Sequence, residues 1–95
     1  MESYELIFIV VPTVEDEALQ AQVETVSNRI VQLGGEVIKV DVWGRRQLAY
    51  PIKKFAEGQY VLVNMQLPAQ SVVTLERDLK ISESVLRHLV VRANE

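Results

Sequence analysis

The stretch from Tyr4 to Val11 (YELIFIVV) decides the fold. It is rich in β-branched and aromatic residues and almost continuously apolar, which is typical of a strand at the centre of a sheet. Pro12 follows, and a proline has no N–H to donate to a sheet, so the strand is expected to end there. Residues 59–67 (QYVLVNMQL) have a similar character. Both stretches are predicted to be central strands.

Two segments have the apolar spacing of amphipathic helices. One runs from about Val14 to Leu33, where Thr13 and Asp16 have the spacing of a capping box. Gly34 and Gly35 follow, and glycine readily supplies a left-handed C-cap. Pro68 opens the second helix, which extends to about Lys80. The apolar stripes of the two predicted helices are Leu19, Val23, Val26, Ile30 and Leu33, and Val72, Leu75 and Leu79.

The remaining strands are predicted from alternation. Residues 36–43 (EVIKVDVW) form one strand, with Val37 breaking the pattern and indicating a bulge or an ambiguous register. Residues 44–58 form a long hairpin arm, in which Pro51 favours an edge position or a bend. Residues 85–92 form the last strand. In the second strand Ile38, Val40 and Val42 are expected on one face, with Lys39, Asp41 and Trp43 on the other.

The resulting order, β-α-β-β-α-β, predicts an α+β fold with both helices on one face of the sheet. The sheet is expected to be four-stranded and antiparallel, with spatial order 4-1-3-2, which is the ferredoxin-like split βαβ plaid. Residues 1–95 are expected to form a single domain. The uncovered face is expected to meet a partner, although scattered exposed aliphatic residues are also normal. Its candidates are Ile7, Ile9, Trp43, Tyr60, Leu62, Leu89 and Val91.

The composition excludes several classes of protein. The 95 residues contain no cysteine, so disulfides, thiolate zinc sites and a cysteine nucleophile are excluded. The longest apolar run, residues 6–12, is far shorter than the roughly 20 residues of a membrane span. The acidic N-terminus indicates neither a signal peptide nor a transit peptide. His88 is the sole histidine, and no other residues suggest a catalytic or metal site, so we expect no enzyme activity, cofactor or metal.

Charge is unevenly distributed along the chain, whose net charge is −3. Residues 39–54 carry five basic residues and one acidic residue, a net charge of +4, which leaves −7 for the remainder. A local basic segment can meet a polyanion even on an acidic protein, whereas the simpler interpretation is a solvated hairpin.

The segment from Gly44 to Lys53 (GRRQLAYPIK) resembles the signature of the sixth protein of the bacterial small ribosomal subunit, S-six. That family's pattern is glycine, any residue, a basic residue, a polar residue, Leu, Ala or Ser, Tyr, any residue, Ile, and usually a basic or small polar residue. Every position is met. The resemblance covers essentially the whole chain, and its other matches are Tyr4-Glu5, Asp41, Trp43, Gly58-Gln59-Tyr60, Pro68, Leu86-Arg87 and Val90-Val91-Arg92.

The resemblance implies a structural protein of the ribosome, in the cytoplasm, without catalysis or a cofactor. Proteins of this family bind the central domain of small-subunit ribosomal RNA during assembly, as a heterodimer with ribosomal protein S-eighteen. The competing hypothesis is a ferredoxin-like regulatory domain that binds a small molecule, because such domains have little local signature.

The site residues are assigned from this resemblance and from the chemistry of their side chains. Four basic side chains are placed to contact RNA phosphates: Arg45, Arg46, Lys53 and Lys54. A second RNA patch is expected on the neighbouring first and last strands, from Tyr4, Arg87 and Arg92. The residues expected to pack or to meet the protein partner are Trp43, Leu48, Tyr50 and Ile52.

Overall fold

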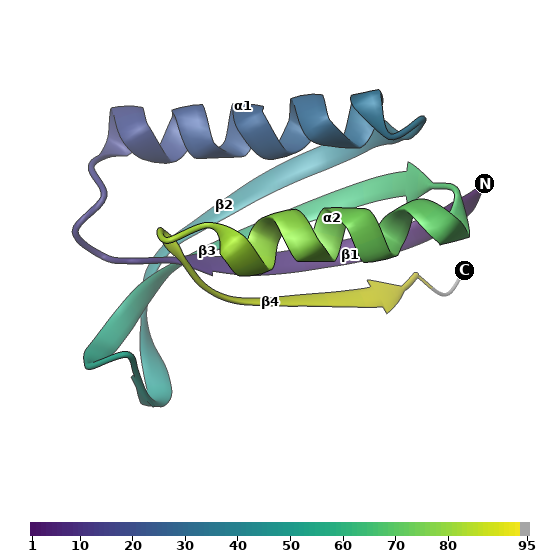
Figure 1. Cartoon of the computed structure of the whole chain (residues 1–95). Coiled ribbons are helices and arrows are strands. Elements are labelled where there is room, and N and C mark those ends of the chain that lie inside the picture. The colour runs from purple at the N-terminus through teal and green to yellow at the C-terminus, as the bar shows by residue number, and fades with distance from the viewer. Residues whose placement is uncertain (94–95) are drawn as a thin grey trace.

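The structure, a computed structural model, describes residues 1–93 and consists of one sheet with two helices on one side (Figure 1). The neighbours in the sheet are antiparallel and follow the order β2-β3-β1-β4, which confirms the predicted order. The elements are β1 (Glu2–Val10), α1 (Asp16–Gln32), β2 (Glu36–Ile52), β3 (Phe55–Leu67), α2 (Ala69–Ile81) and β4 (Val85–Arg92).

The main core lies between the helices and one face of the sheet. Alternate residues of β1 and β3 point into it. Burying one large aliphatic or aromatic side chain stabilises the fold by about 1.5–3 kcal/mol, so this core supplies most of the driving force. Its fully buried members include Leu6, Phe8, Val10, Ile30, Val61, Val63, Met65, Leu67 and Leu75.

The two ends of α1 differ in how well the sequence predicts them. Gly34 adopts a φ of 90° and the Gly35 N–H donates to the Ile30 carbonyl over 2.9 Å, which is the expected glycine C-cap. The predicted capping box is wrong: the helix begins at Asp16, and its N-cap residue makes no side-chain hydrogen bond. The side chain of Gln59 donates to the Val14 carbonyl over 2.8 Å, and this contact fixes the preceding loop outside the helix.

The second strand is much longer than predicted. β2 and β3 remain strands through most of the arm, and the edge position of β2 tolerates Pro51. The expected bulge is confirmed, because the pairing of β2 with β3 shifts between Val37 and Lys39. The prediction that Ile38 shares a face with Val40 and Val42 is wrong, whereas Val40 and Val42 do share one, opposite Val63 and Val61. The bulge turns Ile38 outward, where it is 57% exposed, and Val37 packs on the core with Val40.

A two-residue turn joins β2 to β3 and places two lysines at the tip of the arm. Lys53 and Lys54 have φ angles of 49° and 73°, both in the left-handed region. A turn with two such residues is of the I′ kind, which strongly prefers Asn-Gly. Side chains with a Cβ adopt this conformation at a cost of roughly 1–2 kcal/mol per residue. The turn therefore carries conformational strain at the two lysines.

Replacing Lys54→Gly is expected to raise the free energy of unfolding by about 0.5–1 kcal/mol, because relief of the left-handed strain exceeds the added entropy of glycine. Urea denaturation followed by circular dichroism measures this change. Lys54→Ala is the control, since it removes the same charge but retains Cβ. A gain of equal size in the alanine variant would show that charge, and not backbone strain, limits the turn.

Candidate nucleic-acid interface

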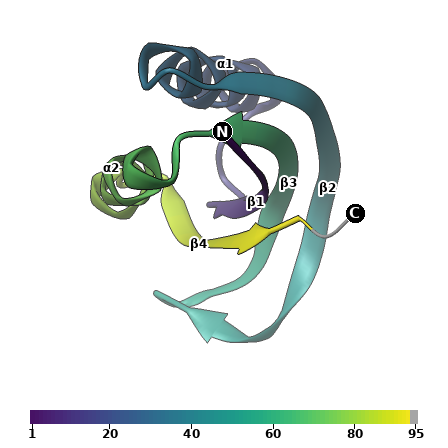
Figure 2. The ribbon, with the colours of Figure 1, turned by 90° about the vertical axis from the view of Figure 1, so that its right-hand side faces the viewer.

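The arm formed by β2 and β3 beyond Gly44 bends over the face of the sheet that the helices leave uncovered (Figure 2). Leu48 of the arm is 9% exposed and packs with Ile9 of β1 and Leu86 of β4, which are 7% and 8% exposed. These three residues form a second, smaller core. The predicted open face is therefore partly covered, and Ile9 is not available to a partner. Leu48, assigned to packing or to partner contact, is used in packing.

Gly58 of β3 makes this bend possible. A Cβ at Gly58 would lie 2.3 Å from Cγ2 of Ile9, far inside van der Waals contact, and 3.6 Å from Cδ2 of Leu48. A larger residue would force Ile9 and the arm apart. The glycine that begins the matched stretch Gly58-Gln59-Tyr60 thus serves the packing of the arm and not a ligand.

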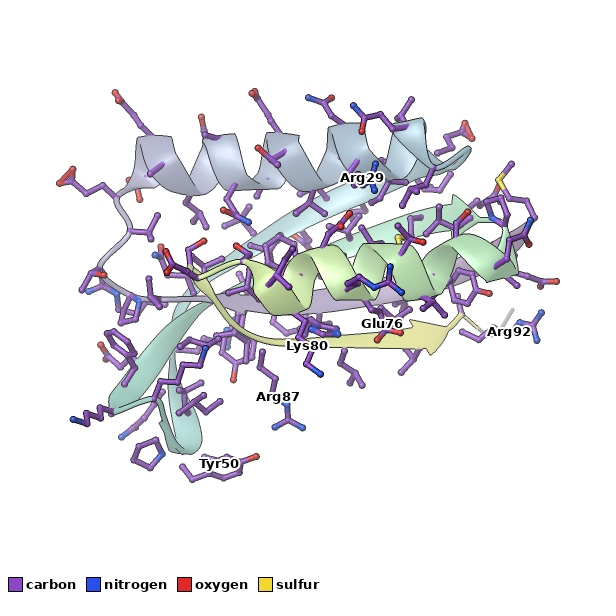
Figure 3. All side chains as sticks on the ribbon, viewed as in Figure 1. Arg29, Tyr50, Glu76, Lys80, Arg87 and Arg92 are labelled. Carbon is purple, nitrogen blue, oxygen red and sulfur yellow. The ribbon has the colours of Figure 1, made fainter. Side chains whose placement is uncertain are left out.

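A side-chain hydrogen bond ties the arm to β4. The Arg87 guanidinium donates to the hydroxyl of Tyr50 over 2.9 Å, and the two side chains reach toward each other from β4 and the arm (Figure 3). Tyr50 remains 58% exposed. Arg87 is predicted to contact RNA, and Tyr50 is predicted to contact the protein partner. The two predicted binding surfaces therefore adjoin at this hydrogen bond.

An aromatic pair lies at the base of the arm. The rings of Trp43 and Tyr60 are nearly parallel, at 11°, with centroids 6.1 Å apart. The Arg46 guanidinium lies 5.5 Å from the centroid of the Trp43 ring, at a distance typical of a cation–π contact. Trp43 remains 39% exposed in this arrangement. The stack brings Trp43 of β2 beside Tyr60 of β3.

The four basic residues of the arm are all exposed. Arg45 donates to the Pro12 carbonyl over 2.9 Å, which fixes its side chain against the loop before α1. Arg46 is held over Trp43, while Lys53 and Lys54 project from the turn. Within residues 1–93, none of these four takes part in an ion pair within 4.0 Å. Their charges are therefore available to an anionic partner.

The predicted second patch is divided in the structure. Arg92 pairs with Tyr4, but Arg87 pairs with Ile9, on the opposite face and nearer the arm. Grouping Arg87 with Tyr4 and Arg92 is therefore wrong, since an odd separation along a strand places side chains on opposite faces. Tyr4 packs partly against the main core.

Arg92 already has an anionic partner at the end of the sheet where β1 begins and β4 ends (Figure 1). The Glu2 carboxylate accepts its hydrogen bond and raises the pKa of the Arg92 guanidinium above its ordinary value. An RNA phosphate would have to compete with Glu2 for this side chain. Arg92 is therefore a weaker candidate for phosphate binding than the basic residues of the arm.

An apolar area remains on the uncovered face, next to the aromatic pair. Leu89 and Val91 of β4 are 51% and 41% exposed, and Ile7 and Leu62 of the central strands are half-buried. A hollow of about 300 Å³ lies at the edge of this area, and it is lined by Ile7, Tyr60, Leu89, the buried Ile9, and the polar residues Arg87 and His88. Exposed apolar residues gathered around a hollow are typical of a surface that meets another protein.

The sequence reasoning missed Lys80, which lies near the arm in space but far from it in sequence. It also left His88 without a role, and His88 Nε2 lies 3.3 Å from a Glu76 carboxylate oxygen on α2.

Among residues 1–93, no group of three or more His, Asp or Glu side chains is arranged to hold a metal ion. Neither helix in that range is long and apolar enough to cross a membrane.

Comparisons with known proteins agree with this architecture. The family described as Ribosomal protein S6 matches residues 3–92. Small ribosomal subunit protein bS6 of Heliobacterium modesticaldum is 45% identical over 95 residues, covering 100% of this chain and 99% of that protein. The protein of the same name from Clostridium acetobutylicum is 46% identical over 91 residues, covering 96% of each. The crystal structure of 30S ribosomal protein S6 from Thermotoga maritima superposes with a TM-score of 0.91 at 32% identity, covering 97% of this chain and 87% of that one.

The fold together with these matches places the chain among small ferredoxin-like ribonucleoprotein components. The chain belongs to the ribosomal protein S6 family. It is a structural protein of the small ribosomal subunit, acts in translation on the cytoplasmic ribosome, and is not an enzyme. This membership favours the ribosomal interpretation over a small-molecule regulatory domain.

Truncation of Leu48→Ala is expected to lower the free energy of unfolding by about 2 kcal/mol, at the low end for a buried leucine because the second core is small. The control Tyr50→Phe removes only the exposed hydrogen bond to Arg87 and is expected to cost about 0.5 kcal/mol. Denaturant titrations of both variants measure the difference. Equal costs for the two would contradict the packing of the arm on the sheet.

Proposed function

We propose that this chain binds the central domain of small-subunit ribosomal RNA, as a heterodimer with ribosomal protein S-eighteen. The observation that carries the proposal is the arm, which presents four exposed basic residues beside an exposed apolar area. A charged surface that adjoins an apolar surface suits a protein that binds an RNA and a second protein at the same time.

The basic arm supplies the RNA contacts. Arg45 and Arg46 offer guanidinium groups that can bind a phosphate through two parallel hydrogen bonds, and Lys53 and Lys54 act as point charges. Contacts of this kind position an RNA without reading its sequence. Selection of the central domain would then depend on RNA shape and on the partner. At the other end of the sheet, Tyr4 and Arg92 provide a smaller contact, which Glu2 weakens.

We expect the protein partner to bind the uncovered face of the sheet. Trp43, together with Leu89 and Val91, offers exposed apolar surface there, and the exposed ring of Tyr50 extends it onto the arm. Aromatic residues of this kind commonly dominate the binding energy of protein interfaces. Ile52 contributes less, since it is partly buried against the second core, and Leu48 supports the arm from within.

Reversing the two arginine charges, Arg45→Glu with Arg46→Glu, is expected to leave the fold intact and to weaken incorporation into small subunits at least tenfold. Each surface change should alter stability by less than about 0.5 kcal/mol. Co-sedimentation with reconstituted subunits measures incorporation. The control is Arg77→Glu with Gln70→Glu and Asn28→Asp, because these exposed helix positions make the same change in net charge away from the arm and the uncovered face. Equal loss in both variants would contradict a specific role for the arm.

The isolated chain is expected to bind central-domain RNA weakly and to need its protein partner. Its net charge is −3, and the residues outside 39–54 carry −7, so the rest of the molecule adds no net attraction for the polyanion and affinity depends on the few contacts of the arm. Titration of the RNA with the chain alone, and then with the chain and S-eighteen, tests this. Tight binding by the chain alone at physiological salt would contradict the need for a partner.

A further inference from the structure

A groove of about 530 Å³ lies between the tip of the arm, the last turn of α2 and the start of β4. Three basic side chains line it, one from each element: Lys53, Lys80 and Arg87. We propose that this groove binds an RNA phosphate at a site separate from the Arg45–Arg46 pair. The inference rests on the proposed RNA binding and deepens it, because it adds Lys80 and moves Arg87 to this site.

The three charges are free to act on a ligand. Lys53, Lys80 and Arg87 are exposed, and within the part of the chain that the structure describes none forms an ion pair within 4.0 Å. The bond to Tyr50 holds Arg87 in place but uses only one of its five N–H donors. Among the residues that line the groove there is no carboxylate. His88 also lines the groove, and its Nε2 lies 3.3 Å from a carboxylate oxygen of Glu76, which is not among the lining residues.

The floor of the groove is apolar, formed by Leu79, Val85 and Leu86, which are at most 8% exposed. Buried apolar atoms beneath the charges exclude water and lower the local dielectric, so attraction between the basic groups and an anion is stronger than on an open surface. Figure 3 shows Lys80 and Arg87 projecting from α2 and β4 on the same side of the molecule.

The turn at the tip of the arm gives an independent reason to assign a function to Lys53. A left-handed φ of 49° is unfavourable for lysine, and a type I′ turn would be better served by asparagine or glycine. Backbone strain of this kind clusters at binding sites, where the position of a side chain matters more than local stability. In this conformation Lys53 lines the groove, whereas its neighbour Lys54 does not.

An RNA phosphate fits this groove better than a protein carboxylate does. Arg87 connects the groove to the arm through Tyr50, and the same arm carries Arg45 and Arg46. Several separate cationic sites on one arm and its flank suit the regular series of phosphates along an RNA strand. The exposed apolar area that suits a protein partner includes Leu89 and Val91, which do not line the groove.

The test compares Lys80→Gln with Arg77→Gln, two exposed positions on the same helix that lose the same charge, of which only Lys80 lines the groove. Affinity for a central-domain RNA transcript is measured with S-eighteen present, over a range of salt concentrations. Lys80→Gln is expected to weaken binding about fivefold at 0.1 M salt and to reduce the slope of log affinity against log salt by about one contact. Arg77→Gln is expected to leave both unchanged.

Three results would overturn the inference. Equal losses in the two variants would indicate a diffuse charge effect, and no loss in Lys80→Gln would show that the groove is unused. Weaker binding of Lys80→Gln to S-eighteen without RNA would show that the groove meets protein. In each case the unmodified chain still binds the transcript and the proposed function stands. If the unmodified chain does not bind even with the partner, the proposed function and the groove fail together.

Discussion

The packing of Leu48 between Ile9 and Leu86 is the interaction on which the functional surface depends. Without it, residues 44–58 would be an extended hairpin projecting into solvent, and a two-stranded hairpin alone is marginally stable. The contact bends the arm onto the sheet and leaves Gly58 no room for a side chain. It also brings Tyr50 within hydrogen-bonding distance of Arg87, so the basic residues of the arm and of β4 form one surface.

The same packing separates two kinds of surface on one face of the sheet. The arm covers Ile9 and the adjoining end of the face, and the remaining part, around Leu89 and Val91, stays exposed. Trp43 lies at the boundary, with one side against Tyr60, while Arg46 lies near its ring. A charged region and an apolar region are thus fixed relative to each other by a small core, and an RNA and a protein can contact the chain side by side.

The sequence predicts the main sheet well because its signals are local. The apolar runs of β1 and β3, the helical spacing and the Gly34 C-cap each depend on a few consecutive residues, and they led to the correct strand order. The bend of the arm depends on residues far apart, since Leu48 meets Ile9 and Leu86 only after folding. For the same reason Lys80 could not be assigned, and Arg87 was grouped with Arg92 although they lie on opposite faces.

Salt screening explains why the arm can act on RNA although the chain is acidic. At physiological ionic strength charges interact over about 8 Å, and the molecule is 36 Å long, so acidic groups near the termini hardly reduce the field at the arm. What limits affinity is the number of phosphates that the arm can neutralise. Because each contact contributes a fixed part of the salt-dependent affinity, a handful of basic residues gives only weak binding at cellular salt. A protein partner bound to the apolar area beside the arm can add further phosphate contacts. Such a partner therefore raises the affinity for RNA more than the removal of distant acidic residues would.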